Sequence, residues 1–186
     1  MTTEDIFRRI IGALDATGIP YMLTGSFASS YHGIPRATQD IDLVVAPTAD
    51  QLRNLVHLFL DTEYYVSEEA ALDALTCESQ FNVIDFATGW KVDLIIRKSR
   101  PFSHTEFKRR ALVDFFGLRL FIASAEDVLL AKLEWAKVGQ SIRQLEDCAN
   151  LLRVRSGELD RAYIEHWVAQ LGLEEQWGNA RRMAGI

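Results

Sequence analysis

The sequence is poor in cysteine, in proline and in positive charge, and each shortage excludes a class of protein. Its two cysteines, Cys77 and Cys148, lie far apart and lack the spacing of a metal site or a disulfide framework. We interpret both as small buried hydrophobic residues of a protein in a reducing compartment. Four prolines leave no Pro-rich linker. The net charge of -6 excludes a uniformly basic nucleic-acid coat protein.

Several functional motifs are also missing from the sequence. There is no Walker phosphate loop, no Gly-x-Ser-x-Gly nucleophile turn and no dinucleotide fingerprint, and the four histidines show no ligand spacing. No apolar run is long enough to cross a membrane, and the opening MTTEDIFRRI is unlike a signal peptide. We therefore expect a cytoplasmic protein of one domain, or of one domain with a small helical appendage.

The hydrophobic pattern changes its period once along the chain. Up to Ala123, helical stretches alternate with short apolar runs typical of strands, and from Ser124 onward every stretch has the helical period. Ser124 and Asp127 have the spacing of a capping box, which predicts that a helix begins there. The sequence thus predicts an α+β fold, with a mixed β-sheet flanked by helices over residues 1–123 and a helical C-terminal subdomain over residues 124–186. Strands are expected over residues 21–24, 39–45, 80–86, 90–97 and 118–123, and helices over 3–17, 26–31, 49–61, 68–75, 125–138, 141–155, 159–171 and 174–183.

The most informative segment is an apolar strand that carries two carboxylates. Asp40 and Asp42 are separated by one residue, so a strand places both on the same face. Like charges at that spacing raise each other's pKa unless a cation neutralises them, and a hard, oxygen-preferring ion such as Mg²⁺ or Mn²⁺ suits the task. A third carboxylate on a neighbouring strand would complete such a site. Asp93 lies in the middle of an apolar run and is favoured over Asp85, which lies nearer a turn whose donors can satisfy it.

A small-residue turn precedes the acidic strand. Gly25 and Ser26 follow an apolar run, and such a turn lets backbone N–H groups and a hydroxyl approach phosphate oxygens. Arg36 is expected to reach a phosphate. Thr38 is expected to fix either the acidic strand or a metal-bound water.

This arrangement resembles the nucleotidyltransferase superfamily, which has the polymerase-beta-like fold. The pattern is a Gly-Ser turn, a short helix, an Asp-x-Asp strand and a later acidic strand. The segment Arg36–Asp42 is similar to the Arg-x-Thr-x-Asp-Ile-Asp form found in AbiEii-type abortive-infection toxins. That group also has a Lys-Leu pair on a helix and an Asp on the next helix, which Lys132-Leu133 and Asp147 match. The resemblance implies that Lys132 holds nucleotide phosphate and that Asp147 supports the active site.

The resemblance implies a metal-dependent nucleotidyltransferase that moves a nucleoside monophosphate from an NTP to an acceptor hydroxyl. An RNA acceptor such as a tRNA end, a role in toxin–antitoxin or phage-defence systems and a cognate antitoxin partner are further expectations. The alternatives are a binding module of the same fold with little or no catalysis, or a transferase acting on a small molecule or a protein. The expected metal ligands are Asp40, Asp42 and Asp93; the expected catalytic residues are these three and Asp147; the expected nucleotide-binding residues are Gly25, Ser26, Arg36, Thr38 and Lys132.

One local excess of positive charge follows the third acidic strand. Residues 97–110 hold six of the chain's 20 lysines and arginines, in an otherwise acidic protein. A polyanion can dock only where positive charge is local, so this segment is the expected RNA contact. The alternative is an ordinary solvated face. The six residues are Arg97, Lys98, Arg100, Lys108, Arg109 and Arg110.

Overall fold

The structure, a computed structural model, describes residues 2–60, 62–155 and 157–186. The chain forms two compact units, each assembled from two segments of sequence. The α/β unit comprises Met1–Thr24 and Thr38–Ile122, and the helical unit comprises Gly25–Ala37 and Ala123–Ile186. The short segment Gly25–Ala37 therefore groups with the helices that follow residue 122, whereas the sequence prediction kept it within an α/β domain of residues 1–123.

The α/β unit is built on a mixed β-sheet with the strand order β3-β4-β5-β2-β1-β7-β6. The two parallel pairs are β2 with β5 and β1 with β7, and the remaining neighbours are antiparallel. The central strands have apolar residues on both faces, as strands covered on both sides must. The strands are β1 (Tyr21–Leu23), β2 (Asp40–Val45), β3 (Tyr64–Tyr65), β4 (Gln80–Asp85), β5 (Lys91–Ile96), β6 (Ala111–Phe115) and β7 (Leu118–Ile122).

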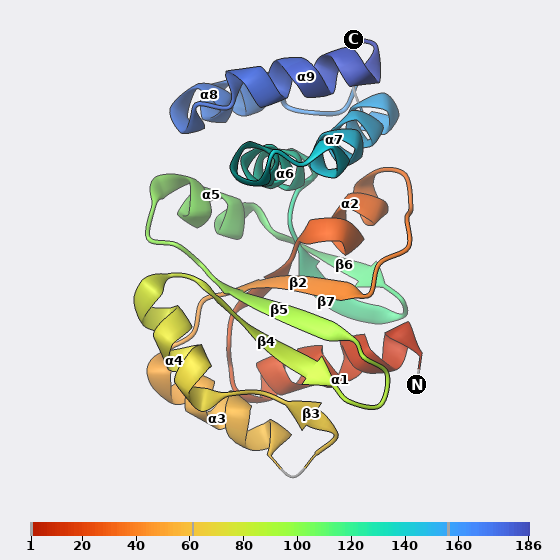
Figure 1. Ribbon diagram of the computed structural model, residues 1–186. Coiled ribbons are helices and arrows are strands. Elements are labelled where there is room, and N and C mark those ends of the chain that lie inside the picture. Colours follow the sequence, from red (N-terminus) through yellow and green to blue (C-terminus); the bar gives the residue numbers. More distant parts are fainter. Residues whose placement is uncertain (1, 61, 156) are drawn as a thin grey trace. The chain divides into compact units, whose positions relative to one another are not determined.

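Helices cover both faces of this sheet. Figure 1 shows α1, α3 and α4 on one side of the sheet and α5 on the other. Capping boxes begin α1 at Thr2 and α3 at Thr48, so the sequence itself sets where these helices start. Each then buries one apolar stripe, which in α1 includes Ile6, Ile10 and Leu14. The helices are α1 (Thr3–Ala16), α3 (Ala49–Phe59), α4 (Glu68–Cys77) and α5 (Pro101–Arg109).

The helical unit consists of α2 and the helices after residue 122. Ser124 caps α6 by accepting a hydrogen bond from the Asp127 N–H, as the sequence predicts. The fully buried Asp127 also accepts a hydrogen bond from Tyr163, 2.6 Å away, and this bond joins α8 to α6. The helices are α2 (Gly25–His32), α6 (Ala125–Gly139), α7 (Ile142–Arg155), α8 (Arg161–Leu171) and α9 (Glu174–Ala184).

Some further features differ from the sequence prediction, among them the short strand β3, which was not expected. Residues 101–115 form a helix and a strand, α5 and β6, where only a basic segment was expected. Cys148 is buried as predicted, but the prediction for Cys77 is wrong because Cys77 lies exposed at the end of α4. Cys77 belongs to the last turn of a ten-residue helix, and that turn lies near solvent. The residue type alone does not indicate this exposure. Among the described residues, no helix is long and apolar enough to span a membrane.

Candidate active site

Three carboxylates meet on two neighbouring strands of the α/β unit. Asp40 and Asp42 stand on β2, where the exposed or half-exposed aspartates alternate with the buried Ile41. Strands β2 and β5 run parallel, and their register pairs Asp42 with Asp93. Paired residues of adjacent strands point to the same face, so all three carboxylates share one face of the sheet. This is the arrangement that the sequence predicts for the acidic site.

Asp93 is nearly buried, with 6% of its surface exposed, and it has two polar partners. The Lys91 ammonium lies 2.9 Å from its carboxylate, and the Asn82 side-chain amide donates a hydrogen bond to it. The hydrogen bond to Asp93 raises the pKa of Lys91, and the negative charges of Asp93, Asp40 and Asp42 act in the same direction, against partial burial. Lys91 is therefore a cation that interacts electrostatically with all three carboxylates.

Asp85, the alternative candidate for the third carboxylate, instead stabilises a turn. It ends β4 and is buried, but its oxygens accept hydrogen bonds from the Ala87 N–H at 2.9 Å and from the Thr88 hydroxyl at 2.7 Å. Its register partner is Tyr64 on β3, on the side of β4 away from β2. Asp85 thus closes the β4–β5 turn, and Asp93 is the residue paired with the acidic strand.

The carboxylates do not form a closed metal cage by themselves. In the described parts of the chain, no group of three or more His, Cys, Asp or Glu residues converges closely enough to enclose a metal ion. The donor set nevertheless suits a hard cation, because carboxylate oxygens are the ligands that Mg²⁺ prefers. Lys91 supplies a positive charge at the same place. A Mg²⁺ ion bound here would take its remaining ligands from water and from substrate phosphates.

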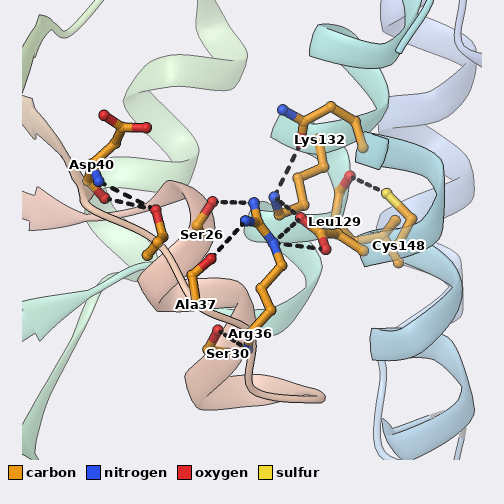
Figure 2. A network of polar contacts seen from close by, with 11 residues as sticks. Ser26, Ser30, Arg36, Ala37, Asp40, Leu129, Lys132 and Cys148 are labelled. Carbon is orange, nitrogen blue, oxygen red and sulfur yellow. Dashed lines mark hydrogen bonds and ion pairs between the residues drawn. The ribbon is translucent and has the colours of Figure 1, made fainter. Parts of the chain in front are cut away.

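The helical unit holds a second polar cluster, centred on Asp147. Figure 2 shows its members Ser26, Arg36 and Lys132. The Arg36 Nε lies 3.1 and 3.2 Å from the two carboxylate oxygens of Asp147, and another nitrogen of the same guanidinium donates to the Ser26 hydroxyl. The Lys132 ammonium lies 2.7 Å from Asp147 and 3.0 Å from the side-chain oxygen of Gln144. Four residues that the sequence places far apart, Ser26, Arg36, Lys132 and Asp147, are therefore brought together.

This cluster carries an excess of positive charge. One carboxylate serves two cations, and Lys132 and Asp147 are only 3% and 6% exposed. A buried cation needs a counter-charge, and Asp147 supplies it for Lys132. The balance leaves one net positive charge beside the N-terminus of α2, where backbone N–H groups also favour anions. The arrangement can bind an anionic group such as a phosphate.

Three of the predicted nucleotide-binding residues act on the backbone or on other side chains. Gly25 begins α2 with φ of 64°, a left-handed conformation that glycine adopts without strain. The Ser26 hydroxyl, expected to bind phosphate directly, accepts a hydrogen bond from Arg36 and so orients that guanidinium. The Thr38 hydroxyl accepts a bond of 3.2 Å from the Asp40 N–H, which fixes the start of β2.

Sequence reasoning missed three members of these clusters, Lys91, Asn82 and Gln144. Lys91 precedes Asp93 by two residues, so strand alternation alone could have placed both on one face. Gln144 precedes Asp147 by three residues, which is one helical turn. All three residues lie outside the family pattern, and Asn82 is placed beside Asp93 only by the pairing of β4 with β5.

The basic segment at residues 97–110 is only partly exposed to solvent. Lys98 and Lys108 are exposed. The guanidinium of Arg100 lies over Phe102 and those of Arg97 and Arg110 lie over Phe107, so these three side chains pack against the fold.

Comparison with known proteins supports the architecture. No family model and no curated protein matches the chain. Several solved structures, however, do match the chain. The antibiotic-resistance factor ANT(2'')-Ia aligns with a TM-score of 0.60 at 13% identity, over 94% of this chain and 96% of its own.

Two further solved structures align over most of both chains. An antigenic nucleotidyltransferase-like protein from Paracoccidioides brasiliensis gives a TM-score of 0.58 at 16% identity, covering 96% of this chain and 91% of its own. The lincosamide antibiotic adenylyltransferase LnuA, bound to lincomycin, gives 0.54 at 13% identity, covering 81% of this chain and 96% of its own. The chain therefore has the fold of nucleotidyltransferases, a mixed sheet flanked by helices and followed by helices.

Proposed function

We propose that this protein is a metal-dependent nucleotidyltransferase. The observation that carries the proposal is the register of β2 and β5, which sets Asp42 beside Asp93 on the face that also carries Asp40. Three carboxylates crowded on one sheet face are costly unless a cation neutralises them. The nucleotidyltransferase fold of the solved structures supports the same function.

In this proposal Asp40, Asp42 and Asp93 hold Mg²⁺ or Mn²⁺, which when bound neutralises the phosphates and orients them for in-line displacement. Asp93 accepts the proton of the acceptor hydroxyl. The hydroxyl oxygen forms a bond to the α-phosphorus of the NTP, the bond from that phosphorus to the β-phosphate oxygen breaks, and pyrophosphate leaves. The chain's own contribution is to position the reactants and to stabilise the developing charge.

The positive cluster of the helical unit binds phosphate in this proposal. Lys132 contributes a charged ammonium and Arg36 a planar guanidinium, which suits bidentate contact with phosphate oxygens. Asp147 and Ser26 are positioning residues, because they hold the two cations through hydrogen bonds of the described network. Gly25 begins α2, and the backbone N–H groups at the N-terminus of this helix favour an anion.

Two acceptor classes follow from different observations. An RNA acceptor such as a tRNA end follows from the AbiEii-like pattern at Arg36–Asp42 and from the basic segment, and it brings with it a toxin or phage-defence role and an antitoxin partner. A small hydroxyl compound follows from the likeness to ANT(2'')-Ia and LnuA, whose alignments cover nearly the whole of those proteins. We favour RNA because six basic residues gather in one segment of an acidic chain.

The test is to incubate the full chain with each α-labelled NTP and Mg²⁺, together with total cellular RNA, with aminoglycoside and lincosamide antibiotics, or with no acceptor. We expect label to enter RNA from one or two of the NTPs and to require Mg²⁺. Label in an antibiotic would assign the small-molecule class. Absence of label from every acceptor, with NTP binding intact, would favour the non-catalytic binding module.

A further inference from the structure

Two arginines of the α/β unit pack against the same aromatic ring. Arg97 follows β5 and Arg110 follows α5, and their guanidinium carbons lie 5.4 and 4.2 Å from the centre of the Phe107 ring. Arg110 also lies 4.9 Å from the centre of the Phe121 ring. Aromatic faces attract cations, so the rings hold both guanidiniums in fixed positions. We call these two residues the arginine pair.

The arginine pair has no anionic partner among the described residues. Within the part of the chain that the structure describes, neither guanidinium forms an ion pair, and the Nε of each is buried without a hydrogen-bond acceptor. Arg110 donates one hydrogen bond, to the Phe107 carbonyl. Burial lowers the pKa of Arg110, and the nearby charge of Arg97 acts in the same direction. Two like charges that are partly removed from water and left unneutralised are costly, unless an anion completes the site.

The position of Arg97 relates the pair to the proposed metal site of the same unit. Its N–H donates to the Val45 carbonyl at 2.8 Å, so the ladder between β2 and β5 continues by one residue. Arg97 lies four residues beyond Asp93, and strand alternation places both on one face. Asp93 and Arg97 are therefore ~13 Å apart along the strand. An α-phosphate bound at the carboxylates cannot reach Arg97, but a longer acceptor can.

We propose that the arginine pair is a phosphate-binding site for the acceptor, and that it takes a backbone phosphate of single-stranded RNA. Guanidinium groups bind phosphate oxygens through paired, charge-assisted hydrogen bonds. This inference rests on the proposed nucleotidyl transfer for its biological meaning, but the site itself does not depend on catalysis. Lys98 and Lys108 are exposed and contribute only general attraction.

The test measures binding without NTP or Mg²⁺, so its result is independent of the transfer reaction. The probes are a fluorescent ten-nucleotide single-stranded RNA, titrated at several salt concentrations, and inorganic phosphate followed by calorimetry. The variants are Arg97→Met and Arg110→Met, which keep an apolar stem against Phe107 but remove the charge. The matched control is Lys108→Met, which removes one charge from an exposed position of the same segment.

We expect each arginine variant to weaken RNA binding by about tenfold, as loss of a charge-assisted contact does. The log–log salt slope should fall by roughly 0.7, the value for one phosphate on a single strand. The lysine control should change affinity by less than about threefold, as loss of a general surface charge does. The arginine variants should bind NTP as the wild type does.

Thermal melting in phosphate-free buffer separates this site from a structural role. If the pair is an anion site, removing one charge relieves repulsion, and the variants melt at or above the wild-type temperature. Variants that melt lower and bind RNA and phosphate like the wild type would overturn the proposal. If the wild type binds inorganic phosphate but never RNA, and the arginine variants lose phosphate binding, the phosphate site stands and takes a small phosphorylated acceptor.

Discussion

The two polar clusters of this molecule carry excess charge of opposite sign, negative in the α/β unit and positive in the helical unit. In the α/β unit, three carboxylates on one sheet face lie beside one lysine, and Asp40 is exposed while Asp42 is half-buried. In the helical unit, two cations share the buried Asp147, and each contact is at most 3.2 Å long. In our proposal the first cluster takes an added cation, whereas in the second Asp147 supplies the counter-charge of the buried Lys132 and one positive charge remains in excess. In this proposal the first cluster holds a metal ion, and the second both stabilises the fold and binds an anion.

The largest effect on stability is expected at Asp147. Asp147→Asn removes the charge that neutralises the buried Lys132, and breaking a buried pair from one side costs ~3–5 kcal/mol. The free energy of unfolding, measured with urea, should fall by that amount. Glu146→Gln is the matched control, because Glu146 is an exposed neighbour on the same helix. It should change stability by less than ~0.5 kcal/mol. Equal effects of the two substitutions would mean that the cluster contributes little to the fold.

Arg36 should matter for nucleotide more than for stability. Arg36→Met leaves Lys132 on Asp147, so the buried pair survives while one phosphate donor is lost. We expect NTP affinity to fall by ~10- to 100-fold, as loss of a charge-assisted hydrogen bond does. Calorimetric titration with a non-hydrolysable NTP measures it. Arg53→Met, an exposed arginine on α3, is the control. NTP affinity that is unchanged in Arg36→Met would exclude Arg36 from the phosphate site.

Lys91 should compete with the metal in the α/β unit. Lys91→Met removes the cation beside Asp93, so Mg²⁺ should bind about two- to fivefold more tightly, in proportion to an exposed ion pair of ~0.5–1 kcal/mol. Mg²⁺-dependent thermal stabilisation measures this change, with Lys98→Met as the control. Weaker Mg²⁺ binding in Lys91→Met would contradict the idea that Lys91 stands in for a metal and would make it a support for Asp93.

The smallest expected effect is the acid sensitivity conferred by His32. Burial lowers the pKa of His32 below its usual 6.5, and the charge of Arg155 adds to this, although the hydrogen bond to the Ala123 carbonyl opposes it. The unfolded chain then binds a proton more readily than the folded one, so stability is lost as the pH falls below 6.5. His32→Gln should flatten that part of the stability profile, and His57→Gln, an exposed site on α3, should not. Equal profiles for all three proteins would contradict this assignment.

The sequence predicted the α/β unit better than the helical cluster, for a physical reason. Strand alternation is local, so the spacing of Asp40 and Asp42 and the apolar flanks of Asp93 were enough to place three carboxylates on one face. The Arg36–Asp147 ion pair joins residues 111 positions apart. Nothing local in the sequence encodes that contact, and only the resemblance to a family pattern pointed to Lys132 and Asp147.

The grouping of Gly25–Ala37 with the helical unit was equally hidden. Its turn and short helix follow a strand directly in sequence, so local reasoning assigned them to the sheet domain. The role of Ser26 changed for the same reason, because its hydrogen bond to Arg36 depends on how the segment between them folds back. The α5–β6 region was missed because its mixture of aromatic and basic residues has no clear period.

The most direct test of the central claim is the rate of Mg²⁺-dependent pyrophosphate release from NTP in the presence of the identified acceptor. It should be measured for the wild type and for Asp40→Asn and Asp42→Asn, with Asp50→Asn on α3 as the control. Each β2 variant removes a ligand worth several kcal/mol in the transition state, so release should fall by on the order of 10³-fold. Melting temperature without metal should hold or rise, because a like-charge pair is relieved. Wild-type release in either β2 variant would contradict the account.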